Sequence, residues 1–377
     1  MDNAVRLFNA LKRFKVGEMK ILHVITSLQT GGAETLIVNL LPRFRALGHE
    51  VGLVVFNGER TALMERLEQE CPECKIYKFG KSYYNPWYII KLIRIMRKYD
   101  VVHTHNSSPQ FFAAIANLLC SKKLVTTEHS TNNRKRQQGG LIRIVDKWIY
   151  RQYHKVICIS EVAEKMLRGY LRNTNGNAIC TINNGVDVEK FYNSKPIKEL
   201  QTERFVVVMV AGFREAKDQD TLIRTMSLLS KEQYELWLVG DGDRREKLQL
   251  MVDSLQLQEQ VRFLGLRTDV QNILKSADIV VMSSHWEGLS LSNIEGMASG
   301  KPFVASDVDG LREVTKNYGL LFPHGDAEAL AEIIEKLHND TTFYQEVANR
   351  CYSRARQFDI SKTVEGYNDV YCKVSKR

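Results

Sequence analysis

The chain is 377 residues long, with 44% hydrophobic and 26% charged residues. These proportions are those of a soluble globular protein, and the length exceeds what one core usually serves, so we expect two domains. No apolar run reaches the roughly 18 to 20 residues that would span a bilayer. The seven cysteines are scattered along the chain, which is typical of a reducing compartment and predicts a cytoplasmic protein.

The net charge of +9 is concentrated in the first half of the chain. Residues 1–198 hold 31 Lys and Arg against 16 Asp and Glu, whereas residues 199–377 hold 22 against 28. The acidic second half argues against a protein that wraps nucleic acid. The basic first half would suit an anionic membrane face or a lipid diphosphate, although a merely solvated surface is the alternative.

Two basic segments could meet such an anionic partner. Residues 1–18 combine apolar and basic residues at helical spacing, which predicts a short amphipathic helix on a membrane surface. An upstream start codon, or an accessory helix packed on the first domain, would also explain them. Residues 131–140 are polar and basic, and Arg134 and Arg136 would suit an acceptor phosphate there. An ordinary solvated loop is the alternative.

From Lys20 onward, short apolar runs alternate with amphipathic segments, which predicts parallel sheets with crossover helices. A valine-rich run at 205–211 starts a second series after a polar stretch. We predict α/β domains at residues 19–192 and 204–357, a linker at 193–203 and a last helix at 358–377. The strands are expected at residues 21–25, 51–56, 75–79, 101–104, 124–127, 156–159, 179–182, 205–211, 236–239, 261–264, 279–281 and 302–305.

The stretch Asp278–Asp309 is predicted to be a strand, a polar turn, a helix and a second strand. Ligands bind at the carboxyl ends of parallel strands, and Gly288 would let the chain approach a phosphate at the helix start. Glu287 and Glu295 flank this turn and could accept hydrogen bonds from sugar hydroxyls. The alternative for Glu295 is a capping-box partner of Ser292, since S-x-x-E is a helix-start pattern.

A longer motif surrounds this glutamate pair. Glu287 and Glu295 are followed by Gly300-Lys301-Pro302 and by Asp309-Gly310-Leu311-Arg312-Glu313. This order resembles the retaining nucleotide-sugar glycosyltransferases of family 4, which have the GT-B fold. The resemblance implies two Rossmann-like domains whose parallel sheets face each other across a cleft, with the last helix crossing back onto the first domain. It also implies that Glu287 meets the transferred sugar and Glu295 holds the nucleotide ribose.

Motifs of the same family follow several strands of the first domain. Gly31 and Gly32 lie in the turn after the first strand, where the family places two glycines under the donor's phosphates and sugar. His129 matches the family's active-site histidine, beside the donor sugar. His105 matches a less uniform family position, and we expect it to contact the acceptor. His103 is expected to be structural.

The second domain carries a cationic motif after its first strand. A lysine or arginine at a helix start could neutralise a leaving diphosphate. The family pattern there is usually G-R-x-x-x-x-K. When the chain is aligned on Lys217, the arginine position holds Gly212. Lys217 therefore carries over, and Arg214 is the expected substitute for the missing arginine.

Two D-x-D patterns, Asp218-x-Asp220 and Asp241-x-Asp243, look like those that hold a divalent metal in other glycosyltransferases. Aspartate is also a good helix cap, and GT-B enzymes generally work without metal, so we expect neither a metal nor another cofactor. The expected catalytic residues are Glu287, His129, Lys217 and Arg214. The expected donor contacts are Gly31, Gly32, Gly212, Gly240, Leu266, Gly288, Leu289, Ser290, Leu291 and Glu295. The expected acceptor contacts are His105, Arg134 and Arg136.

The resemblance covers nearly the whole chain from Met19 onward. It implies a metal-independent, hexosyltransferase-type enzyme that moves a sugar from a nucleoside diphosphate sugar, with a UDP-sugar favoured, and retains the anomeric configuration. The acceptor is expected to be a glycan or a polyprenyl-diphosphate-linked glycan in polysaccharide biosynthesis, at the cytoplasmic membrane face, with no nucleic-acid partner. A nucleotide-sugar epimerase of the same fold, which needs no acceptor, and a non-catalytic nucleotide-sugar binding protein are the alternatives.

Overall fold

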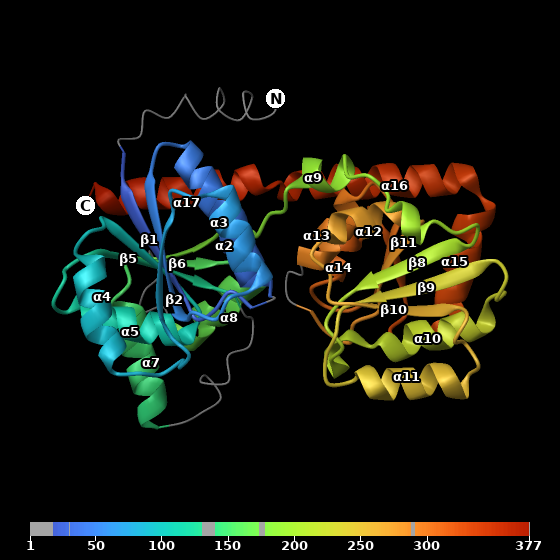
Figure 1. Cartoon of the computed structure of the whole chain (residues 1–377), viewed down its shortest axis with the longest axis horizontal. Coiled ribbons are helices and arrows are strands. Elements are labelled where there is room, and N and C mark those ends of the chain that lie inside the picture. The colour runs from blue at the N-terminus through green and yellow to red at the C-terminus, as the bar shows by residue number, and fades with distance from the viewer. Residues whose placement is uncertain (1–17, 30, 130–139, 173–177, 288–290, 377) are drawn as a thin grey trace. The chain divides into compact units, whose positions relative to one another are not determined.

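The computed structural model describes residues 18–29, 31–129, 140–172, 178–287 and 291–376. The chain forms two compact units (Figure 1). The first contains residues up to Asn184 together with Ile360 onward, and the second is Gly185–Asp359. Residues 193–203, expected to be a linker, belong to the second unit because Leu200 is buried in its core. The helix expected at residues 1–18 lies outside the described residues, apart from Glu18.

The first unit is built on a seven-stranded parallel sheet in the order β3-β2-β1-β4-β5-β6-β7. A helix connects each strand to the next, as parallel neighbours require. The strands are β1 (Lys20–Ile25), β2 (Glu50–Asn57), β3 (Lys75–Gly80), β4 (Val101–His105), β5 (Lys123–Glu128), β6 (Lys155–Cys158) and β7 (Ile179–Thr181). The helices are α2 (Gly32–Ala46), α3 (Ala62–Glu70), α4 (Trp87–Met96), α5 (Ser107–Asn117), α7 (Leu141–Arg151), α8 (Glu161–Leu171) and α17 (Ile360–Ser375).

The second unit has a six-stranded parallel sheet in the order β10-β9-β8-β11-β12-β13. The strands are β8 (Phe205–Val210), β9 (Tyr234–Val239), β10 (Val261–Gly265), β11 (Ile279–Met282), β12 (Phe303–Ser306) and β13 (Leu320–Phe322). The helices are α9 (Val188–Tyr192), α10 (Gln219–Leu228), α11 (Arg245–Ser254), α12 (Val270–Ser276), α13 (Leu291–Ala298), α14 (Arg312–Thr315), α15 (Ala327–Asn339) and α16 (Thr341–Ala355), with 3-10 turns at Lys198–Leu200, Glu215–Lys217 and Arg356–Phe358.

Both sheets have a point at which non-consecutive strands lie side by side. In the first sheet β1 lies beside β4, and in the second β8 lies beside β11. The crossover helices leave such a pair of strands toward opposite sides, so the carboxyl ends of these strands are where folds of this class bind ligands. The two strand pairs therefore locate the candidate site in each unit.

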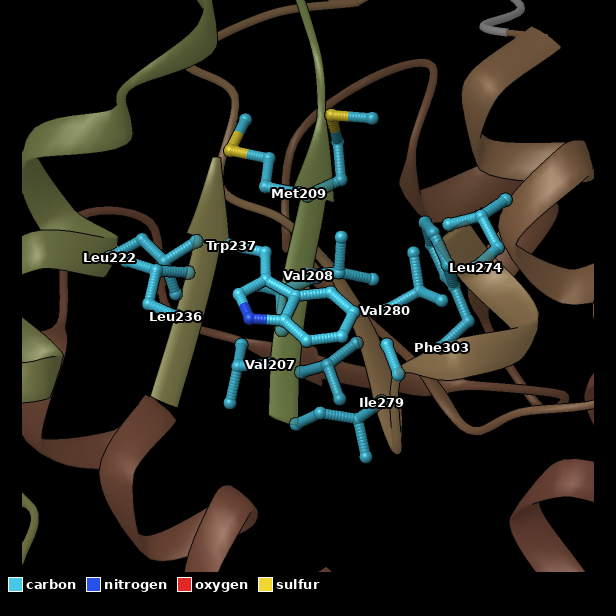
Figure 2. Packing of buried hydrophobic residues seen from close by; sticks show 14 of the residues in the cluster. Val207, Val208, Met209, Leu222, Leu236, Trp237, Leu274, Ile279, Val280 and Phe303 are labelled. Carbon is cyan, nitrogen blue, oxygen red and sulfur yellow. The ribbon is translucent and has the colours of Figure 1, made fainter. Parts of the chain in front are cut away.

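The core of the second unit is organised around Trp237 on β9, the largest of the fully buried side chains. Its indole lies among valines that include Val208 and Val280 (Figure 2). The indole N–H donates to the Glu235 carboxylate at 2.8 Å, so burying this polar atom leaves no unpaired donor. The wide apolar layer keeps β8 and β11 rigid beneath the turns that follow them.

The last helix, α17, belongs to the first unit, which confirms the prediction that it returns there. Tyr367 and Tyr371 lie one turn apart and both are fully buried. The Tyr367 hydroxyl lies 3.1 Å from Thr127 Oγ1 at the end of β5, and Asn368 Oδ1 lies 2.9 Å from His49 Nε2. The helix is thus part of the first unit's core.

The predicted α/β class and the two parallel sheets are confirmed, and the observed strands start and end within about two residues of the expected positions. Strand β13 was missed because its three residues are too few to show a pattern. No helix in the described part of the chain is long and apolar enough to cross a membrane.

Candidate active site

The turns after β8 and β11 are joined by hydrogen bonds. After β8 the chain forms a 3-10 turn, Glu215–Lys217, before α10 begins. Ser283, directly after β11, donates from its hydroxyl to the Asp218 carbonyl oxygen at 2.7 Å. The backbone N–H of His285 donates to the Ala216 carbonyl oxygen at 2.9 Å. These bonds hold the two turns in a fixed relation.

That relation brings Lys217 and Glu287 together. Lys217 Nζ forms a hydrogen-bonded ion pair with Glu287 Oε1, and Ser284 Oγ donates to the same oxygen at 2.9 Å. The side chains of Lys217 and Glu287 are only 22% and 10% exposed. Their charges are therefore less screened than those of a surface pair. The structure thus unites two residues that the sequence separates by 70 positions.

Asp218 determines how Lys217 is presented. It has a left-handed backbone with φ of 48°, and its carboxylate caps α10 by accepting from the N–H and hydroxyl of Thr221 at 3.3 and 2.6 Å. Asp220 instead forms two hydrogen bonds with Arg244, at 2.6 and 2.7 Å. Burial alone would raise the pKa of Asp220, but the bonds and charge of Arg244 outweigh it and lower that pKa.

Other expected donor contacts of the second unit lie on neighbouring turns. Gly240 has a φ of 138°, and a Cβ there would collide with the Ala211 carbonyl oxygen. Only glycine therefore lets the turns after β8 and β9 approach so closely. Arg214 is exposed on the same turn as Gly212, and Leu266 after β10 is also exposed.

Helix α13 begins at Leu291 and contains Glu295. Ser292 lies inside the helix rather than at its N-cap, so the capping-box interpretation of Glu295 does not apply. Glu295 is half-buried, and its role at a ribose stays a prediction. The expected site residues outside the described part of the chain are Gly288, Leu289, Ser290, Arg134 and Arg136.

In the first unit, Gly31 and Gly32 start α2 beside the end of β4. A Cβ on Gly31 would collide with the Glu34 carboxylate in the first turn of that helix. Glu34 also hydrogen-bonds with the side chain of Asn106, the residue after β4. Burial raises the pKa of Glu34, and this hydrogen bond partly opposes the rise. Sequence reasoning identified the glycines and missed the carboxylate that the first of them accommodates.

Four histidines of the first unit form a hydrogen-bonded series, which we call the histidine row. His129 Nε2 lies 3.0 Å from His105 Nδ1, and His105 Nε2 lies 3.0 Å from His23 Nδ1. The hydroxyl of Tyr371 follows, 3.4 Å from His23 Nε2 and 2.6 Å from His103 Nδ1. The row forms because β1, β4 and β5 are adjacent strands: His23 lies on β1, His103 and His105 lie on β4, and His129 directly follows β5.

Burial keeps the histidine row uncharged. It lowers the pKa of His23 to about 3 and that of His129, which is half-buried, to about 4. Burial, and then the neighbouring histidines, lower the pKa values of His103 and His105 well below the ordinary range. His105 was expected to contact the acceptor, but it is fully buried with both ring nitrogens in the row. Instead, it contacts His129 from the core side of the row.

Two sets of side chains among the described residues could hold a metal ion. The sets whose ligand atoms lie within 4.8 Å of one another are His23, His103 and His105 in the first unit, and Asp218, His285 and His324 in the second. The nitrogens of the first set are hydrogen-bonded within the row. In the second set, His285 Nδ1 lies 2.5 Å from His324 Nε2, while Asp218 caps α10. That catalysis needs no metal stays a prediction.

Ser284 and Tyr371 were also missed from the sequence. Ser284 is fully buried, two residues after the end of β11 and three residues before Glu287. Tyr371 lies four residues after Tyr367, on the same face of the last helix, which was expected to cross back onto the first domain. That spacing was the available signal for Tyr371.

Comparison with known families agrees with this geometry. Residues 30–190 match the model of Glycosyltransferase Family 4, and residues 191–358 match that of Glycosyl transferases group 1. Both units of the fold are thereby covered. The chain belongs to the GT-B glycosyltransferases that combine these two domains.

Individual relatives cover most of the chain. The UDP-Gal:alpha-D-GlcNAc-diphosphoundecaprenol alpha-1,3-galactosyltransferase of Escherichia coli is 26% identical over 316 residues, 75% of this chain and 78% of the relative. The N-acetylgalactosamine-N,N'-diacetylbacillosaminyl-diphospho-undecaprenol 4-alpha-N-acetylgalactosaminyltransferase of Campylobacter jejuni is 25% identical over 359 residues, 90% and 95% of the two chains. The crystal structure of HepE from Anabaena in complex with UDP-glucose shares the fold, with a TM-score of 0.81, 23% identity and coverage of 94% and 99%.

Proposed function

We propose that the protein transfers a sugar from a UDP-sugar to a lipid-linked glycan acceptor, with retention of the anomeric configuration and without a metal. The observation that carries this proposal is the pair of Lys217 and Glu287, held at the β8–β11 switch point with Ser284. The names of two relatives, which include a UDP-galactose donor and diphosphoundecaprenol acceptors, support the choice of substrates. They are transferases, so the epimerase alternative is not favoured.

The pair suits a reaction in which negative charge develops on a diphosphate. When the donor binds, Lys217 turns from Glu287 toward the diphosphate, and Glu287 accepts a hydrogen bond from a hydroxyl of the sugar. The bond between the anomeric carbon and the phosphate oxygen breaks while the acceptor oxygen attacks the same face. The acceptor's proton passes to the departing phosphate, so no separate base is needed. Lys217 then stabilises charge that is largest in the transition state.

Nucleotide binding tests the donor site directly. We expect UDP, in the presence of chelator, to raise the melting temperature, since a ligand at a hundredfold its Kd stabilises the folded state by about 2.7 kcal/mol. GDP and ADP should raise it less. The same protein should then transfer the sugar of a UDP-sugar to a polyprenyl-diphosphate-linked glycan, with the linkage read by NMR. No shift with any nucleotide, or an inverted linkage, would contradict the proposal.

We also propose that an anionic lipid bilayer binds the first unit through α4 and α7, so that the acceptor's lipid stays in the membrane. Both helices contact α5 and lie in the same region of the unit (Figure 1). Residues 81–151 hold 13 Lys and Arg against three Asp and Glu. The exposed apolar side chains of these helices are Trp87 and Ile90 on α4 and Leu141, Ile142 and Ile144 on α7. Apolar and basic groups together favour an anionic interface.

Vesicle binding distinguishes this surface from a merely solvated one. The wild type should sediment with vesicles containing phosphatidylglycerol and not with pure phosphatidylcholine. The Leu141→Glu/Ile144→Glu variant should bind about tenfold more weakly, a loss of about 1.4 kcal/mol. Leu250→Glu is the matched control, because Leu250 is as exposed as these residues but lies on α11 of the second unit. Equal binding by all three proteins would contradict the assignment to α7.

A further inference from the structure

The hydrogen-bonded histidines of the first unit cannot choose their tautomers independently. A neutral imidazole carries one N–H, so a histidine that uses both ring nitrogens must donate at one and accept at the other. His105 and His23 both use both nitrogens, and burial keeps them neutral by lowering their pKa values. The two bonds that join His129, His105 and His23 must therefore point in the same direction.

Tyr371 selects that direction. Its hydroxyl has one hydrogen and lies 2.6 Å from His103 Nδ1 but 3.4 Å from His23 Nε2. At 2.6 Å the contact with His103 is shorter than the usual N–H···O range and fits an O–H donor, whereas 3.4 Å is long for either kind of donor, so the single hydrogen belongs to the shorter contact. The hydroxyl therefore donates to His103, and its oxygen accepts the N–H at Nε2 of His23.

The remaining links agree with this assignment. With Nδ1 as an acceptor, His103 carries its hydrogen on Nε2 and donates to Thr127 Oγ1 at 2.8 Å. The Thr127 hydroxyl is then free to donate to the oxygen of Tyr367 at 3.1 Å. Each hydrogen bond of the series then contains one hydrogen. Every group donates to the next one, from His129 at one end to Tyr367 on α17 at the other.

We propose that the histidine row fixes the tautomer of His129, with its hydrogen on Nε2 and an electron pair on Nδ1 that accepts a hydrogen bond from a sugar hydroxyl. His23 Nδ1 accepts from His105 Nε2, and His105 Nδ1 accepts from His129 Nε2. Among the described residues, the hydrogen bond of His129 is the one at Nε2. Its Nδ1 is thereby left for a ligand.

This assignment rests on the proposed function, because the hydroxyl belongs to a substrate of the transfer reaction. His105, His23 and Tyr371 touch no substrate and act as positioning residues. The reverse direction would place an N–H at Nδ1, which cannot accept from a hydroxyl. A tautomer set from the core orients the hydroxyl's hydrogen toward His129 and its oxygen lone pairs away, without any reorganisation during the reaction.

The tautomers can be measured by NMR of protein labelled with 15N-histidine, with the His129 signals assigned from their loss in His129→Gln. We expect wild-type His129 to show a protonated Nε2 and an unprotonated Nδ1. Tyr371→Phe removes the hydroxyl that sets the direction, so His129 should become a mixture of tautomers and kcat should fall by about tenfold, with KM for the donor little changed.

Tyr367→Phe is the matched control, since Tyr367 lies on the same helix face and is equally buried but ends the series beyond Thr127. It should leave the His129 tautomer and kcat unchanged. Loss of folding in Tyr371→Phe would be seen as lost signal dispersion, and the wild-type spectrum alone then tests the assignment.

Three results would overturn the inference. They are a proton on Nδ1 of wild-type His129, an unchanged tautomer in Tyr371→Phe, and a stoichiometric metal bound to the row in the purified protein. The spectrum is recorded without substrate. A failure to transfer any sugar would therefore contradict the proposed function while leaving the tautomer result standing.

Discussion

Lys217→Ala is expected to lower kcat by about 10²- to 10³-fold, as loss of a preorganised group that stabilises developing charge does in other enzymes. The variant also leaves Glu287, which is 10% exposed, as an unpaired carboxylate beside the incoming diphosphate. Single-turnover transfer from a UDP-sugar measures the effect on the chemical step. UDP should also bind more weakly, and the melting-temperature shift should shrink.

Two further proteins make that experiment decisive. Lys231→Ala is the matched control, because Lys231 is an exposed lysine of the same unit that bonds to the Gln256 carbonyl oxygen. It should retain wild-type kcat. In the double variant Lys217→Ala/Glu287→Gln the unpaired charge is absent. Its loss of kcat should therefore be smaller than the sum, in free energy, of the losses in the two single variants. A Lys217→Ala variant with more than half of wild-type kcat would remove Lys217 from the mechanism.

The first unit is expected to lose stability steeply below pH 6.5. The folded-state pKa values of the buried His23, His103 and His105 lie below the unfolded value, so the unfolded chain binds more protons as the pH falls. Their contribution to the free energy of unfolding is complete above about pH 6.5, and it is lost as the pH falls toward the pKa values of the folded state. At pH 5 the shift of His23, whose folded-state pKa is about 3, lowers the free energy of unfolding by about 2 kcal/mol, and His103 and His105 lower it further in the same direction.

Hydrogen exchange read by mass spectrometry can follow the two units separately. Between pH 7.5 and pH 5, and after correction for the intrinsic exchange rate, peptides of β1, β4 and β5 should lose protection well before those of β8 and β9. His324→Gln, which changes an exposed histidine of the second unit, should not alter this order. Equal loss of protection in both units would show that the row is not the source of the acid sensitivity.

The sequence predicts the fold well because local signals decide it. Each strand of the two sheets is a short apolar run between polar turns, and a helix between two strands requires a parallel crossover. The boundary between the units was harder to predict from the sequence. Val188 and Phe191 pack in the second core, although the chain around them is polar and resembles a connection. Which core a short apolar segment joins is decided by tertiary contacts, which a local pattern does not contain.

The candidate site, too, could be predicted only in part from the sequence. Lys217 and Glu287 stand in recognisable motifs, and each follows an expected strand. Their pairing depends on β8 lying beside β11, which strand order along the chain does not reveal. His105 was given the wrong neighbour for a related reason. A histidine at a strand end can point to solvent or into the core, and the buried direction is favoured here because His23 and His129 can complete its hydrogen bonds.

The position of α17 in the chain affects how the protein is made. Residues 360–375 leave the ribosome only after all of Gly185–Asp359 has been synthesised, yet Tyr367 and Tyr371 are core residues of the first unit. The second unit is continuous in sequence and can fold during translation as soon as it emerges. The first must wait with His103 and Thr127 uncovered, so the part that is synthesised first is completed last. A chain that stops before α17 would keep an intact second unit beside a first unit that cannot close its core.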